Sequence, residues 1–153
     1  MSYNNMPVGS SLQWIKDTYE GKMVLDSRSP AGNWLEFELA NIVHGVATLK
    51  VLVRHEMTNP YGNIHGGMMA LIIDESMGWA IASLSTENHF TSMSLNVDFL
   101  YAIKGGDTLT SVAKVVRSGK RIINIDCYVY NSEGTVLAHG TSNLIATKME
   151  FVG

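Results

Sequence analysis

Apolar residues recur along this chain with two different periods, and the first of them predicts a short helix near the N-terminus. Leu12, Ile15 and Tyr19 are three or four residues apart, the spacing that places side chains on one face of an α-helix. Ser11 can cap the start of this helix, and Gly21 can end it. We therefore expect one short amphipathic helix before the first strand.

The second period is the alternation of apolar and polar residues that is typical of strands with one wet face. It is strictest in the sequence NWLEFELA, where Leu35, Phe37 and Leu39 alternate with Glu36 and Glu38. The connections RSGKR and NSEG are of hairpin length, so we expect an antiparallel sheet. Strands are predicted at about 33–40, 45–54, 92–100, 107–117, 122–130 and 135–147.

The longest apolar segment, residues 64–84, separates the second and third of these strands and is broken near its centre by Asp74 and Glu75. Two carboxylates at its centre make it a poor membrane span, so we expect a helix covered by protein on nearly every side. An antiparallel sheet with one very apolar helix can curl around that helix. The prediction is an α+β fold in one domain, 1–153, with residues 1–22 as an N-terminal extension.

Composition excludes several classes of protein. A hydrophobic content of 46% rules out a disordered chain, and a net charge of −3 gives no reason to expect nucleic acid or an anionic membrane as a partner. The N-terminal sequence MSYNNMPVGSS has no basic flank or apolar run, so we expect a cytoplasmic protein. The single cysteine, Cys127, is expected to be a buried, inert thiol. No metal-ligand spacing is found among His44, His55, His65, His89 and His139.

A loop and helix start of unusual composition, NPYGNIHGG, precedes the acidic pair. Asn59, Gly62, the sequence His65-Gly66-Gly67 and Asp74 together resemble the signature of the PaaI-type acyl-CoA thioesterases, which have the hotdog fold. The later segments SMSLNVDFLYAIKGGD and VVRSGKRI are similar to that family as well, so the resemblance covers residues 30–147. The chain departs from the family at Tyr101-Ala102-Ile103, where a Pro-Ala pair is common. It departs again at Gly78, where some hotdog thioesterases have a threonine.

The resemblance implies hydrolysis of acyl-CoA thioesters without a cofactor. A helix N-terminus offers free N–H groups, so the Gly66 N–H can stabilise the oxyanion, a contribution of about 3 kcal/mol for such a donor. Asp74 is expected to act as a general base or as a nucleophile. Asn59 is expected to face Asp74 and to help orient the water or the carbonyl group. His65 and Gly67 are expected to support the substrate-binding loop.

Each of these residues also has a plainer interpretation. The glycines can simply shape the entry into the helix, Asp74 can pair with a buried arginine or a second subunit, and Asn59 can form a turn before Pro60. Glu75 points about 100° away from Asp74 around the helix, as an interface or structural acid, and it is the second candidate for the base. The family likeness suggests that Ser92 supplies a hydroxyl to the site, but strict alternation places it on the polar face of its strand.

A cluster of basic residues lies on the predicted hairpin after residue 116. Lys114, Arg117, Lys120 and Arg121 occur with no acidic residue between Asp107 and Asp126. Arg117, Ser118, Gly119, Lys120 and Arg121 together suit a phosphate-rich ligand such as coenzyme A, and a solvated basic turn is the alternative.

Two other functional classes remain open from the sequence. One is a hotdog dehydratase or hydratase, which would use a histidine together with an acidic residue in catalysis. The other is a non-catalytic acyl-CoA-binding module, which would need no catalytic residue. Free sheet edges favour a homo-oligomer, either a dimer or a dimer of dimers (a homotetramer). Met68, Met69 and Met77 are expected either to border an acyl pocket or to lie in the core.

Overall fold

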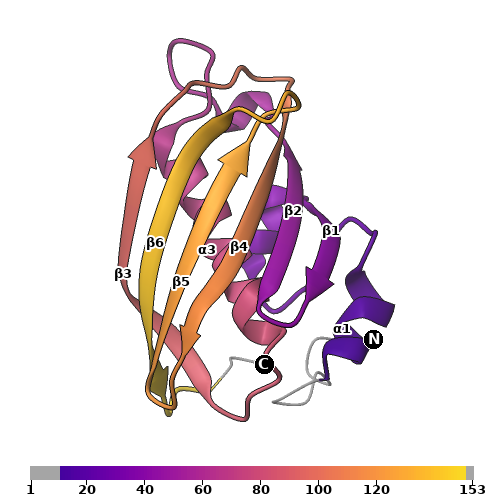
Figure 1. Ribbon diagram of the computed structural model, residues 1–153. Helices are drawn as coiled ribbons and strands as arrows, with labels where there is room; N and C mark the ends of the chain where they lie inside the picture. The colour runs from indigo at the N-terminus through magenta and orange to yellow at the C-terminus, as the bar shows by residue number, and fades with distance from the viewer. Residues whose placement is uncertain (1–10, 151–153) are drawn as a thin grey trace.

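The computed structural model describes residues 11–150, in which six antiparallel strands form one curved sheet around the long helix α3 (Gly66–Ala82), as Figure 1 shows. The strand order is β1-β2-β4-β5-β6-β3, so α3 carries the chain from β2 to the far edge of the sheet. This confirms the predicted α+β architecture. The strands are β1 (Glu38–Val43), β2 (Val46–Leu52), β3 (His89–Phe99), β4 (Thr108–Ser118), β5 (Ile122–Tyr130) and β6 (Val136–Thr147).

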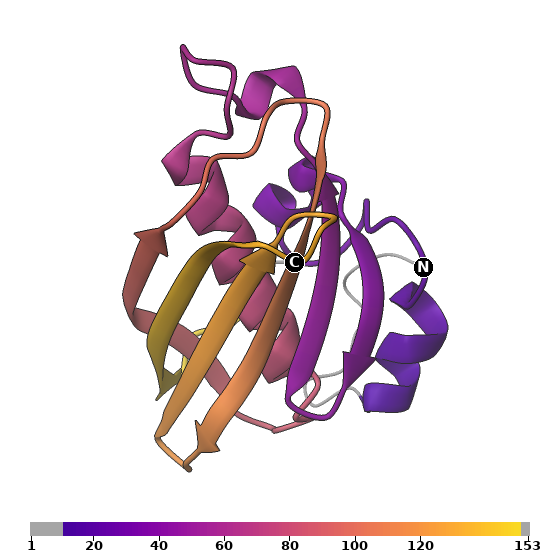
Figure 2. The same ribbon diagram turned by 45° about the horizontal axis from the view of Figure 1, so that its top comes forward.

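Helix α3 packs its large apolar residues against the concave face of the sheet. Met69, Ile72, Ile73 and Met77 are at most 1% exposed, and Figure 2 shows the strands curving around the helix. The helix is nevertheless not covered on every side. A stripe that contains Gly67, Asp74 and Gly78 is exposed in the described chain, so the expected cover on nearly every side leaves this one side open.

The predicted first strand is partly wrong, because its first residues belong to a helix, α2 (Pro30–Leu35). Ser29 caps this helix by accepting a hydrogen bond from the Gly32 N–H at 3.0 Å, and Pro30 occupies the first turn. A serine at the cap position followed directly by a proline is a helix start signal. Here this signal outweighs the apolar and polar alternation that begins at Leu35. The strand itself starts only at Glu38.

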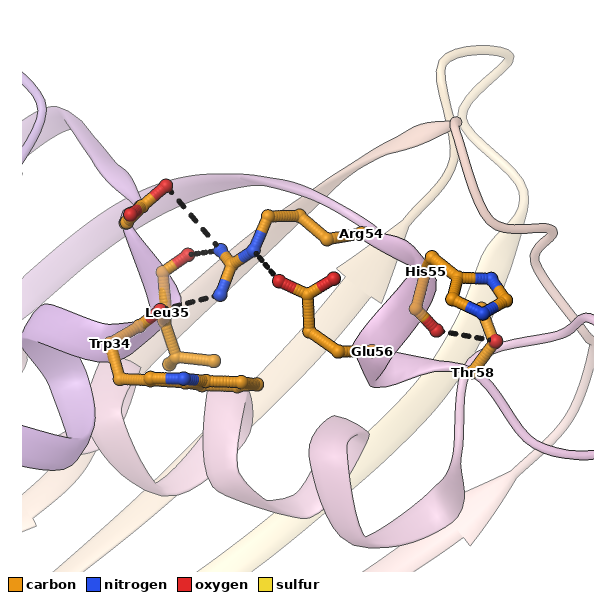
Figure 3. Close-up of polar contacts among 7 residues, drawn as sticks. Trp34, Leu35, Arg54, His55, Glu56 and Thr58 are labelled. Atoms are coloured by element: carbon orange, nitrogen blue, oxygen red, sulfur yellow. Dashed lines mark hydrogen bonds and ion pairs between the residues drawn. The ribbon is translucent and has the colours of Figure 1, made fainter.

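The end of α2 is held by Arg54, as Figure 3 shows. Its guanidinium donates to the carbonyl oxygens of Trp34 at 2.7 Å and Leu35 at 2.8 Å, and it lies 4.7 Å from the centre of the Trp34 ring. Glu56 accepts a further hydrogen bond from the Arg54 Nε at 2.9 Å. Arg54 lies just before a short 3-10 helix (His55–Met57), so it ties α2 to the segment that leads into α3.

The first helix, α1 (Leu12–Tyr19), confirms the prediction for this segment, with the Ser11 hydroxyl accepting from the Trp14 N–H at 3.2 Å. Residues 1–10 of the predicted N-terminal extension lie outside the described residues. None of the helices within residues 11–150 is long and apolar enough to cross a bilayer.

A chain of buried hydroxyl groups connects α3 to the sheet. The Ser76 hydroxyl donates to the Ile72 carbonyl oxygen at 2.7 Å, so its contact with Ser111 at 2.7 Å has Ser111 as the donor. The Cys127 thiol, 3.2 Å away, then donates to Ser111. This confirms the expected burial of Cys127, and burial raises the pKa of its thiol to about 12.

Candidate functional site

Asp74 lies on the open side of α3 and is bonded to Ser92 on β3. The Ser92 hydroxyl donates to the Asp74 Oδ1 at 3.1 Å, and both side chains are exposed in the described chain. A carboxylate held at one oxygen by a hydroxyl keeps its other oxygen for a ligand or water. Both residues were predicted from the sequence, and the structure brings them together.

A β-bulge is the reason that Ser92 faces the helix. Ser92 pairs with Leu144 of β6 and Ser94 pairs with the preceding residue of that strand, so Met93 is an extra residue without its own partner. The bulge shifts the alternation by one position, and Ser92 therefore shares its face with Leu95 instead of opposing it. The assignment of Ser92 to the polar face, made from strict alternation, is wrong for this reason.

Glu75 is the more buried carboxylate of the acidic pair: it is half-buried, whereas Asp74 is exposed. Its two oxygens accept from the Ser29 hydroxyl at 2.9 Å and the Trp79 Nε1–H at 3.2 Å. Its carboxylate packs so closely on α2 that a methyl group on Gly32 would clash with it. Burial raises the pKa of Glu75. These contacts confirm the interpretation of Glu75 as a structural acid. Its partner Ser29 was not predicted, although Ser29-Pro30 is a helix start signal that could have located it.

The first turn of α3 has one free N–H group. His65 caps the helix: its Nδ1 accepts from the Gly67 N–H at 2.9 Å, and its carbonyl oxygen accepts from the Met68 and Met69 N–H groups at 2.9 and 3.1 Å. Within residues 11–150, no acceptor meets the N–H of Gly66. Of the two predicted glycines, Gly66 therefore retains a donor for a ligand, whereas the Gly67 donor is already engaged.

Asn59 lies in the loop before α3 and acts there as a turn former. Its Oδ1 accepts from the N–H groups of Tyr61 at 2.9 Å and Asn63 at 3.2 Å. The loop is fixed further by a backbone bond from the Ile64 N–H to the Ile103 carbonyl oxygen at 2.8 Å. Asn59 is thus held in the loop that leads to Gly66, and within residues 11–150 no hydrogen bond joins it to Asp74.

Gly66 and Asp74 do not meet within one chain. They are eight residues apart on a straight helix, which at 1.5 Å per residue is about 12 Å along the axis. A carbonyl oxygen at the Gly66 N–H is therefore too far from the Asp74 carboxylate of the same chain for one thioester to contact both. The predicted residues form two half-sites: Asp74 with Ser92, and Gly66 with His65 and Asn59.

The predicted phosphate-binding turn is the β4–β5 hairpin. Arg117, Lys120 and Arg121 are exposed, and no acidic side chain of the described residues pairs with them. The turn is closed by a bond from the Gly119 N–H to the Ile122 carbonyl oxygen at 2.9 Å. It lies at the end of the sheet opposite the start of α3, as Figures 1 and 2 show. No group of three or more His, Cys, Asp or Glu within the described residues could hold a metal ion.

Known proteins with similar sequences are thioesterases and esterases. The chain is 26% identical over 104 residues to the acyl-coenzyme A thioesterase PaaI of Escherichia coli, covering 68% of this chain and 73% of that protein. It is 29% identical over 96 residues to a Caenorhabditis elegans protein with the provisional name of an esterase, covering 62% of this chain and 57% of that protein.

Solved structures with the same architecture include two bacterial relatives. A hypothetical thioesterase of Streptococcus pneumoniae, solved with coenzyme A, superimposes with a TM-score of 0.69 at 25% identity, over 72% of this chain and 85% of that one. The PaaI protein of Escherichia coli superimposes with a TM-score of 0.73 at 23% identity, over 78% and 85% of the two chains. These likenesses identify the sheet around α3 as a hotdog fold.

The family model of the thioesterase superfamily matches residues 61–138, about half of the chain. The matched segment runs from the loop before α3 into β6, and so contains Gly66, Asp74, Ser92 and the basic hairpin. This chain belongs to the thioesterase superfamily.

Proposed function

We propose that this protein hydrolyses acyl-CoA thioesters to the free acid and coenzyme A. The observation that carries the proposal is the Asp74–Ser92 hydrogen bond on the open side of α3, together with the unpaired N–H of Gly66 at the start of the same helix. Thioester hydrolysis needs an activated water and a donor for the oxyanion, and these two half-sites supply them.

In this mechanism Ser92 holds Oδ1 of Asp74, and Oδ2 takes a proton from water as the water attacks the carbonyl carbon. The carbonyl oxygen accepts from the Gly66 N–H, and the coenzyme A thiolate leaves. Direct attack by Asp74 would instead expel the coenzyme A thiolate and form an anhydride, and a single turnover in oxygen-labelled water would place label in the Asp74 side chain when water attacks the Asp74 carbonyl carbon.

The 12 Å between the half-sites leads us to propose that each active site forms between two copies of the chain. If two α3 helices pack antiparallel about a two-fold axis at Ala70, which is midway between residues 66 and 74, Gly66 of each copy faces Asp74 of the other. The exposed stripe with Gly67 and Gly78 allows a close approach of two helices, and β3 has a free edge within the described residues.

The same symmetry gives a place to the basic hairpin. The hairpin of one copy lies at the far end of the sheet from the start of α3 in the same copy. An antiparallel partner would bring the start of its α3, and so its Gly66, toward that hairpin. We therefore assign Arg117, Lys120 and Arg121 to the phosphate groups of coenzyme A bound with its thioester at the partner's Gly66.

Release of free thiol from a panel of acyl-CoAs tests the reaction. Wild type is expected to turn over at least one substrate, and Asp74→Asn is expected to lose about 10²- to 10⁴-fold in rate at an unchanged melting temperature. The rate of Ser92→Ala is expected to lie between the rates of wild type and Asp74→Asn. Binding of acyl-CoA without turnover by wild type would refute hydrolysis and support the non-catalytic module.

Mixing two inactive variants tests the composite site. In a heterodimer of Asp74→Asn with a Gly66 variant that lacks the donor, one site has both defects and the other has none. Random exchange of subunits should therefore restore about a quarter of the wild-type activity. No recovery after confirmed exchange would show that both half-sites act within one chain, and would refute the composite site but not hydrolysis.

A further inference from the structure

Phe99, the last residue of β3, reaches from the sheet to the start of α3. It pairs with the fully buried Ala138 of β6, so its side chain is on the face of the sheet that looks toward the helix. The tip of the ring lies against Gly66: a methyl group placed on Gly66 would be 3.4 Å from Cζ and 3.5 Å from Cε1 of the ring. The ring is thus a direct neighbour of the residue with the free N–H.

Phe99 differs from the other apolar residues on this face of β3. Phe90, Leu95 and Val97 pack against the hydrophobic core, whereas Phe99 is outside the core and 59% exposed. The tip of its ring lies near the start of α3, and more than half of the side chain is open to solvent at the edge strand β3. Packing of the described chain therefore leaves most of this ring available for contact with a ligand.

A thioester bound at Gly66 has two substituents on its carbonyl carbon, and the ring suits only one of them. The sulfur side continues into the polar, amide-containing arm of coenzyme A, whereas the acyl side is apolar. Contact between an exposed aromatic ring and the apolar acyl group is favourable, because both surfaces are removed from water. We propose that Phe99 contacts the acyl group of the substrate and determines which acyl groups the protein accepts.

This inference rests on the proposed function, because it takes the Gly66 N–H as the donor to the thioester oxygen. It also predicts a direction of selectivity. The ring tip against Gly66 leaves little room beside the carbonyl carbon, so Phe99 excludes acyl groups that are branched at the α-carbon. Unbranched acyl chains can lie along the exposed part of the ring.

The test compares wild type with Phe99→Ala and Phe99→Leu, using kcat/KM for unbranched and α-branched acyl-CoAs of equal carbon number. Phe99→Ala is expected to raise the ratio of branched to unbranched kcat/KM about tenfold or more, the scale of small changes in apolar pockets. Phe99→Leu is expected to lie between the two. Tyr101→Ala is the matched control, because Tyr101 is 67% exposed nearby and is not among the side chains closest to Gly66.

A second measurement separates failure of this inference from failure of the proposed function. Alkyl-CoA thioethers of the same shapes cannot be hydrolysed, and their dissociation constants are measured with wild type and Phe99→Ala. If wild type hydrolyses acyl-CoAs but neither the kcat/KM ratio nor the order of thioether affinities changes in Phe99→Ala, the role of Phe99 is refuted and hydrolysis stands.

If wild type hydrolyses nothing but the order of thioether affinities changes, the contact is supported and the reaction is refuted. If wild type neither hydrolyses acyl-CoAs nor binds thioethers, both are overturned. A loss of oligomer mass in Phe99→Ala, seen by light scattering with no change in selectivity, would assign the ring to a contact between two copies and overturn the inference.

Discussion

Replacement of Gly66 by proline removes one N–H group and little else. Gly66 is the first residue of α3, a position where proline is well tolerated because its fixed φ suits the helix and the N–H there has no helical partner. The preceding residue, His65, has φ −68° and ψ 137°, values that a residue before proline adopts without strain. An added Cβ meets only the Phe99 ring, at 3.4 Å, which is ordinary contact.

The expected effects on activity and on stability have opposite signs. Loss of an oxyanion donor lowers kcat by about 10²- to 10³-fold, which corresponds to ~2.7–4 kcal/mol of transition-state stabilisation. Proline at a compatible position restricts the unfolded chain, so the free energy of unfolding should stay unchanged or rise by ~0.4–1 kcal/mol. Gly66→Ala adds a similar contact with Phe99 but keeps the N–H, so it serves as the matched control.

Thiol release and urea denaturation are measured for wild type, Gly66→Pro and Gly66→Ala. The reasoning requires that only the proline variant loses most of its kcat and that it does so without loss of stability. Equal activity of Gly66→Pro and Gly66→Ala would remove the Gly66 N–H from the mechanism. A proline variant that is much less stable than wild type would show that this N–H has a structural partner.

Three further predictions follow from buried groups. Burial raises the pKa of Glu75 above its value in the unfolded chain. The protonated carboxyl therefore contributes its stability fully below the unfolded pKa, and this contribution is lost as pH rises through the folded pKa. The melting temperature of Glu75→Gln should accordingly exceed that of wild type by more at about pH 8 than at about pH 4. Ser111→Ala should lower the free energy of unfolding, measured in urea, by about 1–3 kcal/mol. Ser76→Ala should lower it less in the Ser111→Ala background than in wild type, because the two hydroxyls share one hydrogen bond. Additive effects of the two substitutions would contradict the hydrogen-bonded chain. The Cys127 thiol, with its pKa raised to about 12, should react with a thiol reagent only after unfolding, and rapid labelling of the native protein would contradict its burial.

Most of the secondary structure could be predicted from local patterns. The apolar run after His65 predicted α3, and period-two alternation predicted β3 to β6, because each signal lies within the element that it describes. The prediction failed at α2, where the alternation beginning at Leu35 overlapped a helix start at Ser29-Pro30. Two valid local signals competed there, and the cap geometry and the contact of Arg54 with the helix end favoured the helix.

The candidate site could be predicted only residue by residue. Asp74 and Ser92 were both named from the sequence, but strict alternation gave Ser92 the wrong face, since a one-residue bulge reverses every side chain before it. The acidic pair was likewise named from the sequence, yet only the packing of α2 on α3 decided that Glu75 is half-buried and Asp74 exposed.

Composition and spacing by themselves determined the α+β class, the sheet around one apolar helix and the family likeness, because these depend on short-range periodicity and on residues in fixed order. Only the tertiary structure decided how the named residues combine. It placed Asp74 with Ser92, left the Gly66 N–H free beside Phe99, and separated Gly66 from Asp74 by the length of two helical turns. Distances of this kind depend on strand register and helix rise, which no single local pattern contains.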